Sequence, residues 1–143
     1  MSAVVKLIKI THIKTANTAH SVNVSGFGML TLGLACIAQG VKELDYAVEQ
    51  EKELLNCDNE LVKVSLLIKT HEGKEIGVIE KEDGIEFIVH DINCAITQKA
   101  IKKIKQRYAK HVLLHELQSQ GYNKIKEEKL PNGKIRMVVE RWE

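Results

Sequence analysis

Hydrophobic and polar residues alternate most clearly in the middle of the chain. Residues 61–69, 75–80 and 85–90 have the apolar, β-branched composition of strands, and the polar segments 71–74 and 81–84 between them are typical of turns. Alternation with a period of two places one face of each strand on a core. The pattern therefore predicts an antiparallel meander of three strands.

A helical pattern follows, from about residue 95 to residue 120. Apolar side chains recur there at steps of three and four residues, whereas most lysines fall between them. The recurring residues are Ile101, Ile104, Tyr108 and Val112, with Ala109, Leu113 and Leu117 on an adjoining stripe. Thr97 or Asn93 can cap the start of this helix, and Gly121 can end it.

The two ends of the chain also predict strands. Residues 4–13 are rich in β-branched side chains, and residues 122–130 and 135–142 flank Asn132-Gly133, a strong hairpin signal because both positions accept positive φ. Residues 15–25 indicate a loop or a weak strand. The apolar run that begins at Gly26 leaves two alternatives open, a buried helix closed by Gly40 or a buried strand pair around Gly33.

An acidic stretch, residues 41–60, includes a possible strand at 44–48. With 143 residues, the chain has the length of one domain. We expect a single domain over residues 1–143 of the α+β class, with a mainly antiparallel sheet, one long helix in the C-terminal half and a terminal β-hairpin.

The net charge of +2 conceals a division along the chain. Residues 1–95 carry 9 Lys and Arg against 14 Asp and Glu, whereas residues 96–143 carry 12 against 5, which gives −5 and +7. An acidic portion is therefore followed by a basic one. This arrangement predicts electrostatic association with a protein, including a second copy of the same chain.

The cysteines and the apolar runs bear on the compartment. Three cysteines without a CxxC spacing predict neither a disulfide framework nor a zinc ribbon, and a reducing cytoplasmic location fits them best. The longest apolar run, residues 27–38, has 12 residues and is shorter than the roughly 20 that a membrane-spanning helix needs. We expect no membrane insertion.

The basic residues of the predicted helix are the first candidate site. They are Lys99, Lys102, Lys103, Arg107 and Lys110. Such a basic face can bind an acidic protein surface or the phosphates of RNA or DNA. Aromatic residues make up only 4% of the chain, so the stacking platforms of single-strand RNA binders are not indicated.

Other constellations are incomplete. His111 and His115 are four residues apart on a helix and could face one metal ion, but no HExxH motif accompanies them. Cys94 is the only cysteine with a plausible reactive setting, because Cys36 lies in an apolar run and Cys57 has acidic neighbours that disfavour a thiolate. Neither a metal nor a cofactor is predicted, and an enzymatic role based on these residues is the weakest hypothesis.

The final part of the chain resembles a known family. The helical segment Gln106-Arg107-Tyr108-Ala109-Lys110-His111 and the ending Arg141-Trp142 are similar to the Ycf35 family, the domain of unknown function 1257. The resemblance covers mainly residues 61–142, and residues 1–60 diverge from it. It implies no established chemistry, and it implies an association with AAA+ ATPases only through genomic company.

Together these features predict a non-enzymatic protein-binding or adaptor module. Its partners would be itself, another protein or an AAA+ ATPase. The alternative is an RNA- or DNA-binding protein that uses the basic helix 99–110.

Overall fold

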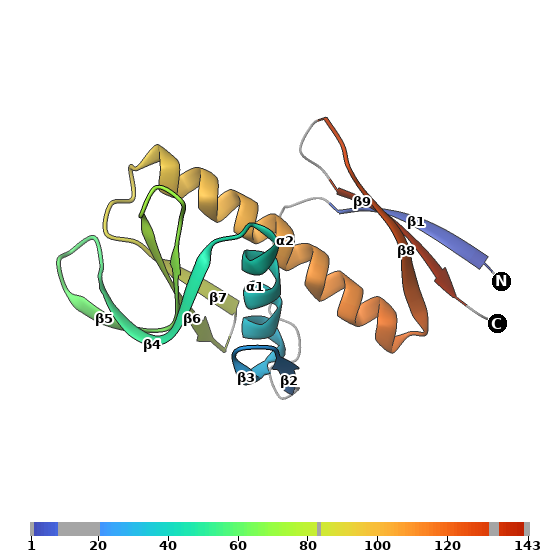
Figure 1. Ribbon diagram of the computed structural model, residues 1–143, viewed down its shortest axis with the longest axis horizontal. Helices are drawn as coiled ribbons and strands as arrows, with labels where there is room; N and C mark the ends of the chain where they lie inside the picture. The colour runs from blue at the N-terminus through green and yellow to red at the C-terminus, as the bar shows by residue number, and fades with distance from the viewer. Residues whose placement is uncertain (1, 9–20, 83, 132–134, 142–143) are drawn as a thin grey trace.

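A computed structural model describes residues 2–8, 21–82, 84–131 and 135–141. Within these ranges two helices and nine strands form an α+β fold (Figure 1), as the sequence predicts. The elements are, in chain order, β1 (Ser2–Ile8), β2 (Ser21–Val24), β3 (Gly28–Thr31), α1 (Leu32–Glu43), β4 (Ala47–Leu55), β5 (Leu61–Lys69), β6 (Glu75–Lys81), β7 (Gly84–Ile88), α2 (Ala95–Ser119), β8 (Tyr122–Lys129) and β9 (Ile135–Arg141).

The predicted meander supplies three of the four strands of the main sheet. Strands β5, β6 and β7 pair antiparallel in sequence order, and β4 joins the outer edge of β5 in an antiparallel register from Ala47↔Lys69 to Leu55↔Leu61. Strand β4 therefore shares only residues 47 and 48 with the predicted strand 44–48 and extends to Leu55, because Leu44 is the C-cap of α1. The apolar side chains of one face of the sheet pack against both helices.

Residues 21–43 favour the helix over the strand pair that the sequence left open, because Gly33 lies in α1 and the observed strand pair turns around Gly26. A short hairpin, β2–β3, comes first, and α1 follows with the Thr31 hydroxyl accepting a hydrogen bond from the Leu34 amide at 3.4 Å. The prediction that Gly40 closes this helix is wrong, because α1 continues to Glu43. A Cβ atom on Gly40 would lie 2.7 Å from the Cβ of Arg107, so this glycine permits the close crossing of α1 and α2.

Helix α2 has the predicted bounds to within one residue, and Gly121 follows its C-cap with a positive φ of 90°, as predicted, but both predicted N-cap residues are wrong. Cys94 occupies the N-cap position, while Thr97 lies within the first turn and is buried. A turn in which the Cys94 amide donates to the Asp91 carbonyl at 3.3 Å comes immediately before the helix, and the N-cap lies one residue after Asn93.

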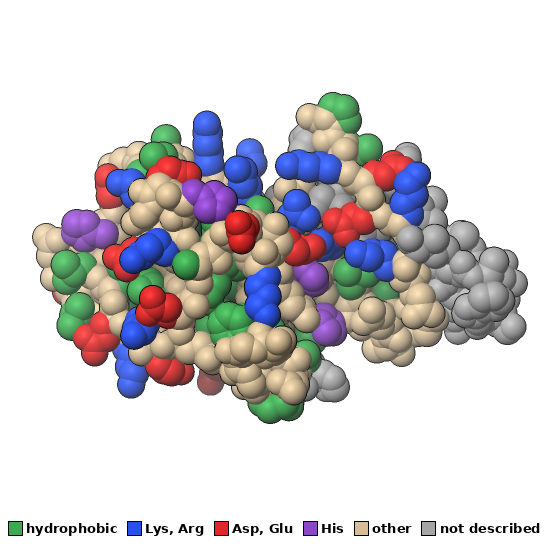
Figure 2. Space-filling view, viewed as in Figure 1, with side chains coloured by type: hydrophobic (Ala, Val, Ile, Leu, Met, Phe, Trp, Pro, Cys, Tyr) green, Lys and Arg blue, Asp and Glu red, His purple; other side chains and the backbone are tan. Residues whose placement is uncertain are grey.

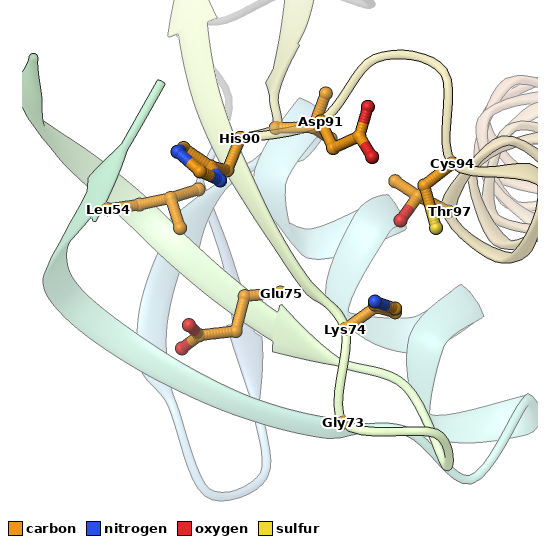
Figure 3. A pocket seen from close by; sticks show the side chains of 9 residues that line it. Leu54, Gly73, Lys74, Glu75, His90, Asp91, Cys94 and Thr97 are labelled. Atoms are coloured by element: carbon orange, nitrogen blue, oxygen red, sulfur yellow. The ribbon is translucent and has the colours of Figure 1, made fainter. Parts of the chain in front are cut away.

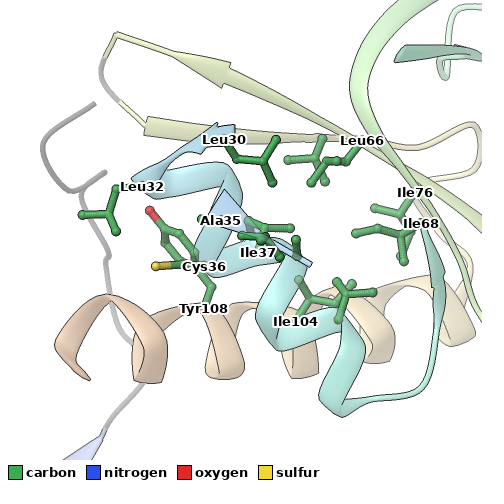
Figure 4. Packing of buried hydrophobic residues seen from close by; sticks show 14 of the residues in the cluster. Leu30, Leu32, Ala35, Cys36, Ile37, Leu66, Ile68, Ile76, Ile104 and Tyr108 are labelled. Carbon is green, nitrogen blue, oxygen red and sulfur yellow. The ribbon is translucent and has the colours of Figure 1, made fainter. Parts of the chain in front are cut away.

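Helix α2 contributes to two separate cores. Ile104 and Tyr108 pack with α1 and the main sheet (Figure 4), whereas Leu114 forms a second cluster with Ala109 and Leu113. Tyr108 and Leu117 are both buried although they are nine residues apart, about two and a half turns, which places them on opposite sides of the helix. The helix therefore changes its buried side along its length.

A three-stranded sheet lies beside the C-terminal half of α2 (Figure 1). Its central strand, β9, pairs antiparallel with β8 and with β1, so the first and last strands of the protein are neighbours. This arrangement confirms the terminal strand pair, although the Asn132-Gly133 turn lies outside the described residues. Among the described helices, none is both long enough and apolar enough to cross a membrane.

The helix crossing generates a stability test. Alanine is favoured over glycine in a helix by about 1 kcal/mol. At Gly40, however, the new methyl group would overlap Arg107, and we expect Gly40→Ala to lower the free energy of unfolding by about 1 to 3 kcal/mol. Urea unfolding followed by circular dichroism measures this loss. Lys102→Ala, at an exposed position of α2, should change the stability by less than about 0.5 kcal/mol. Equal stability of Gly40→Ala and the wild type would contradict the tight crossing.

Candidate functional site

A buried charge cluster joins the two halves of the fold. The side chain of Lys110 on α2 has no solvent exposure, and its Nζ donates hydrogen bonds to the carboxylates of Glu43 and Glu127. Glu43 is the last residue of α1, and Glu127 belongs to β8, with an Nζ–Oε1 distance of 3.2 Å. One ammonium group thus bridges α1, α2 and the three-stranded sheet.

Two further side chains of α2 complete the charge cluster. Arg107 approaches both carboxylates, with Nη1 at 3.9 Å from Glu43 and at 3.6 Å from Glu127. His111 donates from Nε2 to the other oxygen of Glu43 at 2.7 Å. Both carboxylates therefore face Lys110 and Arg107, and Nζ of Lys124 also lies 3.1 Å from Oε2 of Glu127.

The surroundings shift the pKa values of these groups. Burial raises the pKa of Glu43, but its bonds with Lys110 and His111 outweigh burial and hold the pKa below its ordinary value. The pKa of Glu127 is also lowered, because bonds from Lys124 and Lys110 outweigh its burial. Burial lowers the pKa of His111 despite its contact with Glu43. At neutral pH both carboxylates stay ionised, and the imidazole is mainly neutral.

The residues of the predicted basic face have two different environments in the structure. The prediction that Lys110 belongs to an exposed face is wrong, since its ammonium group is buried and bonded within the protein. Arg107 is 20% exposed and is engaged in the same cluster. Lys99, Lys102 and Lys103 are exposed, as the prediction requires.

The exposed lysines have apolar neighbours along the chain. Ile92, just before α2, is 57% exposed, and Ile96 in its first turn is 40% exposed. Ile96, Lys99 and Lys103 follow one another at steps of three and four residues, so they share one side of the helix. We name Ile92, Ile96, Lys99, Lys102 and Lys103 the basic–apolar patch. Lysine or arginine side chains project from the edge along which the N-terminal half of α2 runs (Figure 2).

The predicted histidine pair serves other contacts. His111 bonds Glu43, and His115 Nε2 lies 3.4 Å from Oε1 of Gln39 on α1. In the described part of the chain, no three His, Cys, Asp or Glu side chains are grouped as metal ligands. The two histidines therefore connect α2 to α1.

A pocket of about 210 Å³ lies at the start of α2 (Figure 3). The side chains of Cys94 and Thr97 lie next to each other there, and Lys74, His90 and Asp91 also line the space. Hydrogen bonds from the Thr97 hydroxyl and backbone amides lower the pKa of the Cys94 thiol, and the Lys74 charge adds to this effect. By contrast, burial raises the pKa of Cys36 to about 12.

The other family-motif residues are spread over the fold. Tyr108 is buried in the main core, and Gln106 is partly buried on α2. Arg141 ends β9, paired with Ser2 of β1 and Tyr122 of β8, and Trp142 lies outside the described residues. The segment 106–111 therefore holds the helix against α1 and β8 and does not form an open site.

Sequence reasoning missed the partners of this segment. Glu43 and Glu127 are 84 residues apart in the chain. A lysine on the side of the helix that becomes buried is the one sequence feature that could have pointed to them. It also missed Lys74 beside Cys94, because the β5–β6 turn and the start of α2 meet only in the folded chain.

Comparison with known proteins agrees with the predicted resemblance. The model of a family described as protein of unknown function (DUF1257) matches residues 40–138, so the similarity begins earlier than residue 61. An uncharacterised protein, ycf35 of Cyanophora paradoxa, is 31% identical over 84 residues, which cover 55% of this chain. The chain spans 64% of the length of that relative. No solved structure matches the chain significantly.

The charge cluster predicts a large effect of removing Lys110. Lys110→Met leaves two carboxylates facing each other, and we expect a loss of about 2 to 4 kcal/mol in the free energy of unfolding, because both carboxylates keep some solvent. Lys124→Met is the matched control, since Lys124 bonds the same Glu127 from a 39% exposed position and should contribute less than about 1 kcal/mol. Adding Glu43→Gln and Glu127→Gln to Lys110→Met should restore much of the stability. Similar losses for the two lysine variants would contradict a special role of Lys110.

The pocket predicts a pH-dependent difference between the cysteines. The thiolate is the reactive form, so iodoacetamide should alkylate Cys94 with a pH midpoint below the ordinary thiol value of about 8.5. Thr97→Val should raise that midpoint, because the variant lacks the donating hydroxyl. Mass spectrometry of peptides follows the three sites in one sample, with exposed Cys57 as the internal reference and buried Cys36 unreactive until the protein unfolds. If alkylation of Cys94 rises at the same pH in the wild type and in Thr97→Val, the Thr97 hydroxyl does not lower the pKa of the thiol.

Proposed function

We propose that this chain, which belongs to the DUF1257 family, is a non-enzymatic protein-binding module whose contact surface is the basic–apolar patch. Three lysines and two isoleucines of this patch are exposed together at one end of α2. Within the described residues none of the three lysines forms an ion pair, so their charges are available to a partner. A partner surface that carries carboxylates around apolar side chains fits this composition.

The isoleucines favour a protein over a nucleic acid. Phosphate recognition uses basic and polar groups, and base recognition without grooves uses aromatic stacking. Ile92 and Ile96 offer neither, whereas large apolar side chains surrounded by charge are typical of protein interfaces. RNA or DNA binding by the same lysines remains the alternative function.

The charge cluster supports a binding role in a different way. Its lysine is buried, and its carboxylates, arginine and histidine are bonded to one another, so its reactive groups are occupied. An enzyme needs such groups to be within reach of a substrate. We propose that the charge cluster fixes the end of α1 and the course of α2, which keeps the patch rigid.

The proposal also covers the cellular location of the protein and the identity of its partner. The absence of CxxC pairs and the three free cysteines fit a cytoplasmic protein. One candidate partner is the AAA+ ATPase that the family resemblance implies. An acidic surface on that ATPase would complement the basic–apolar patch.

The function is tested by affinity capture of proteins from nuclease-treated cells of the source organism. We expect the wild-type chain to retain a protein, and Ile92→Ser combined with Ile96→Ser to lose it, since the apolar contacts are removed while every lysine is kept. Met29→Ser is the matched control, because Met29 is 65% exposed and lies in β3, outside the patch. Oligonucleotide binding that weakens between about 50 and 200 mM salt and is unchanged by the isoleucine substitutions would instead support the nucleic-acid alternative.

A further inference from the structure

The main sheet carries a second exposed surface that complements the basic–apolar patch. It lies on the β4–β5 hairpin, and its residues, Glu49, Glu51 and Glu53, Leu55 and Leu61, form what we name the acidic–apolar patch. Leu55 and Leu61 are directly paired across the hairpin, so their side chains leave the same face, and they are 44% and 65% exposed. Acidic and basic side chains are interspersed over the part of the molecule that β4 and β5 occupy (Figures 1 and 2).

The distribution of exposed apolar residues is uneven. Five large hydrophobic side chains are exposed among the described residues, and four of them belong to these two patches. They are Leu55 and Leu61 on the hairpin, and Ile92 and Ile96 at the start of α2. The isoleucine pair is accompanied by three lysines. The leucine pair is accompanied by three glutamates, of which Glu49 is ion-paired with Lys52 on the same strand at 3.3 Å. Lys52, and Lys63 opposite Glu53, reduce the formal charge of this part of the hairpin from −3 to −1 without reversing it.

Both patches lie at the same end of the molecule. Nε2 of His90, at the end of β7, is 2.8 Å from Oδ1 of Asn59 in the hairpin turn, and the pocket lined by Leu54 and Asp91 spans the same junction. Although the patches are neighbours and have opposite charge, the side chains of both stay exposed in the single chain. Their complementary groups can therefore be buried only by another molecule.

We infer that the basic–apolar patch binds the acidic–apolar patch of a second copy of this chain, in a reciprocal dimer. A two-fold axis that brings the helix of one copy onto the hairpin of the other repeats the contact with the roles exchanged. Each contact places three lysines opposite three glutamates around two pairs of apolar side chains. This inference rests on the proposed function, since it names the partner of the same patch.

Charge reversal tests this dimer because the two patches can be changed separately. Lys99→Glu, Lys102→Glu and Lys103→Glu form the helix variant, and Glu49→Lys, Glu51→Lys and Glu53→Lys form the hairpin variant. Sedimentation equilibrium of the full chain should show a wild-type dimer, and each variant alone should dissociate at least about tenfold more readily. An equimolar mixture of the two variants should restore the dimer, because one of its contacts is native and the other has both charges reversed.

A matched control separates local contact from net charge. Glu72→Lys, Glu82→Lys and Glu116→Lys change the charge as much as the hairpin variant does, at exposed positions outside both patches, and should leave dimerisation unchanged. Circular dichroism melts of every variant verify folding.

Several outcomes would overturn the inference. They are a wild-type chain that stays monomeric, a dimer insensitive to either variant, a mixture that does not recover, and a control variant that dissociates as readily. A monomeric wild type that still captures another protein through Ile92 and Ile96 would overturn the dimer and leave the proposed function standing.

Discussion

The position of Lys110 is the constraint on which the arrangement of the fold depends. A fully buried ammonium group is stable in a protein only when acidic groups compensate its lost hydration. Here the compensation comes from Glu43 at the end of α1 and from Glu127 in β8, elements that are distant in sequence. The lysine can be buried only when both elements are in place. The charge cluster therefore couples the main sheet, which α1 covers, to the three-stranded sheet.

This coupling follows from the way α2 serves two cores. Lys99, Lys103 and Lys110 lie on one side of the helix, since steps of seven and eleven residues are close to two and three full turns. That side is exposed at the start of α2, where the main sheet and α1 pack on the other side. Toward the C-terminus β8 covers it. One stripe of basic residues thus supplies both a surface patch and a buried ion pair.

The sequence was sufficient to predict the elements whose pattern is local. The meander 61–88, the helix 95–119 and the two terminal strands all follow from periods of two or of three to four residues. The end of the helix after Thr31 was predicted too early, because Gly40 packs against Arg107 within α1 and does not end the helix. Lys110 was assigned to the surface because the helical period reveals which side is polar but not which element covers that side. Glu43 and Glu127 became partners only through the tertiary fold.

The division of charge along the chain has two different physical uses. Part of it is neutralised internally, where Glu43 of the acidic portion meets Arg107 and Lys110 of the basic portion. Lys110 has no solvent exposure and Arg107 is 20% exposed, so salt screens their attraction to Glu43 less than it screens the attraction between exposed charges. The remainder, on the hairpin and at the start of α2, is exposed, and screening by salt weakens it. The buried pairs therefore maintain the fold under conditions in which the exposed charges already bind less strongly. The proposed association through the two patches would therefore respond to ionic strength, whereas the fold that presents them would not change.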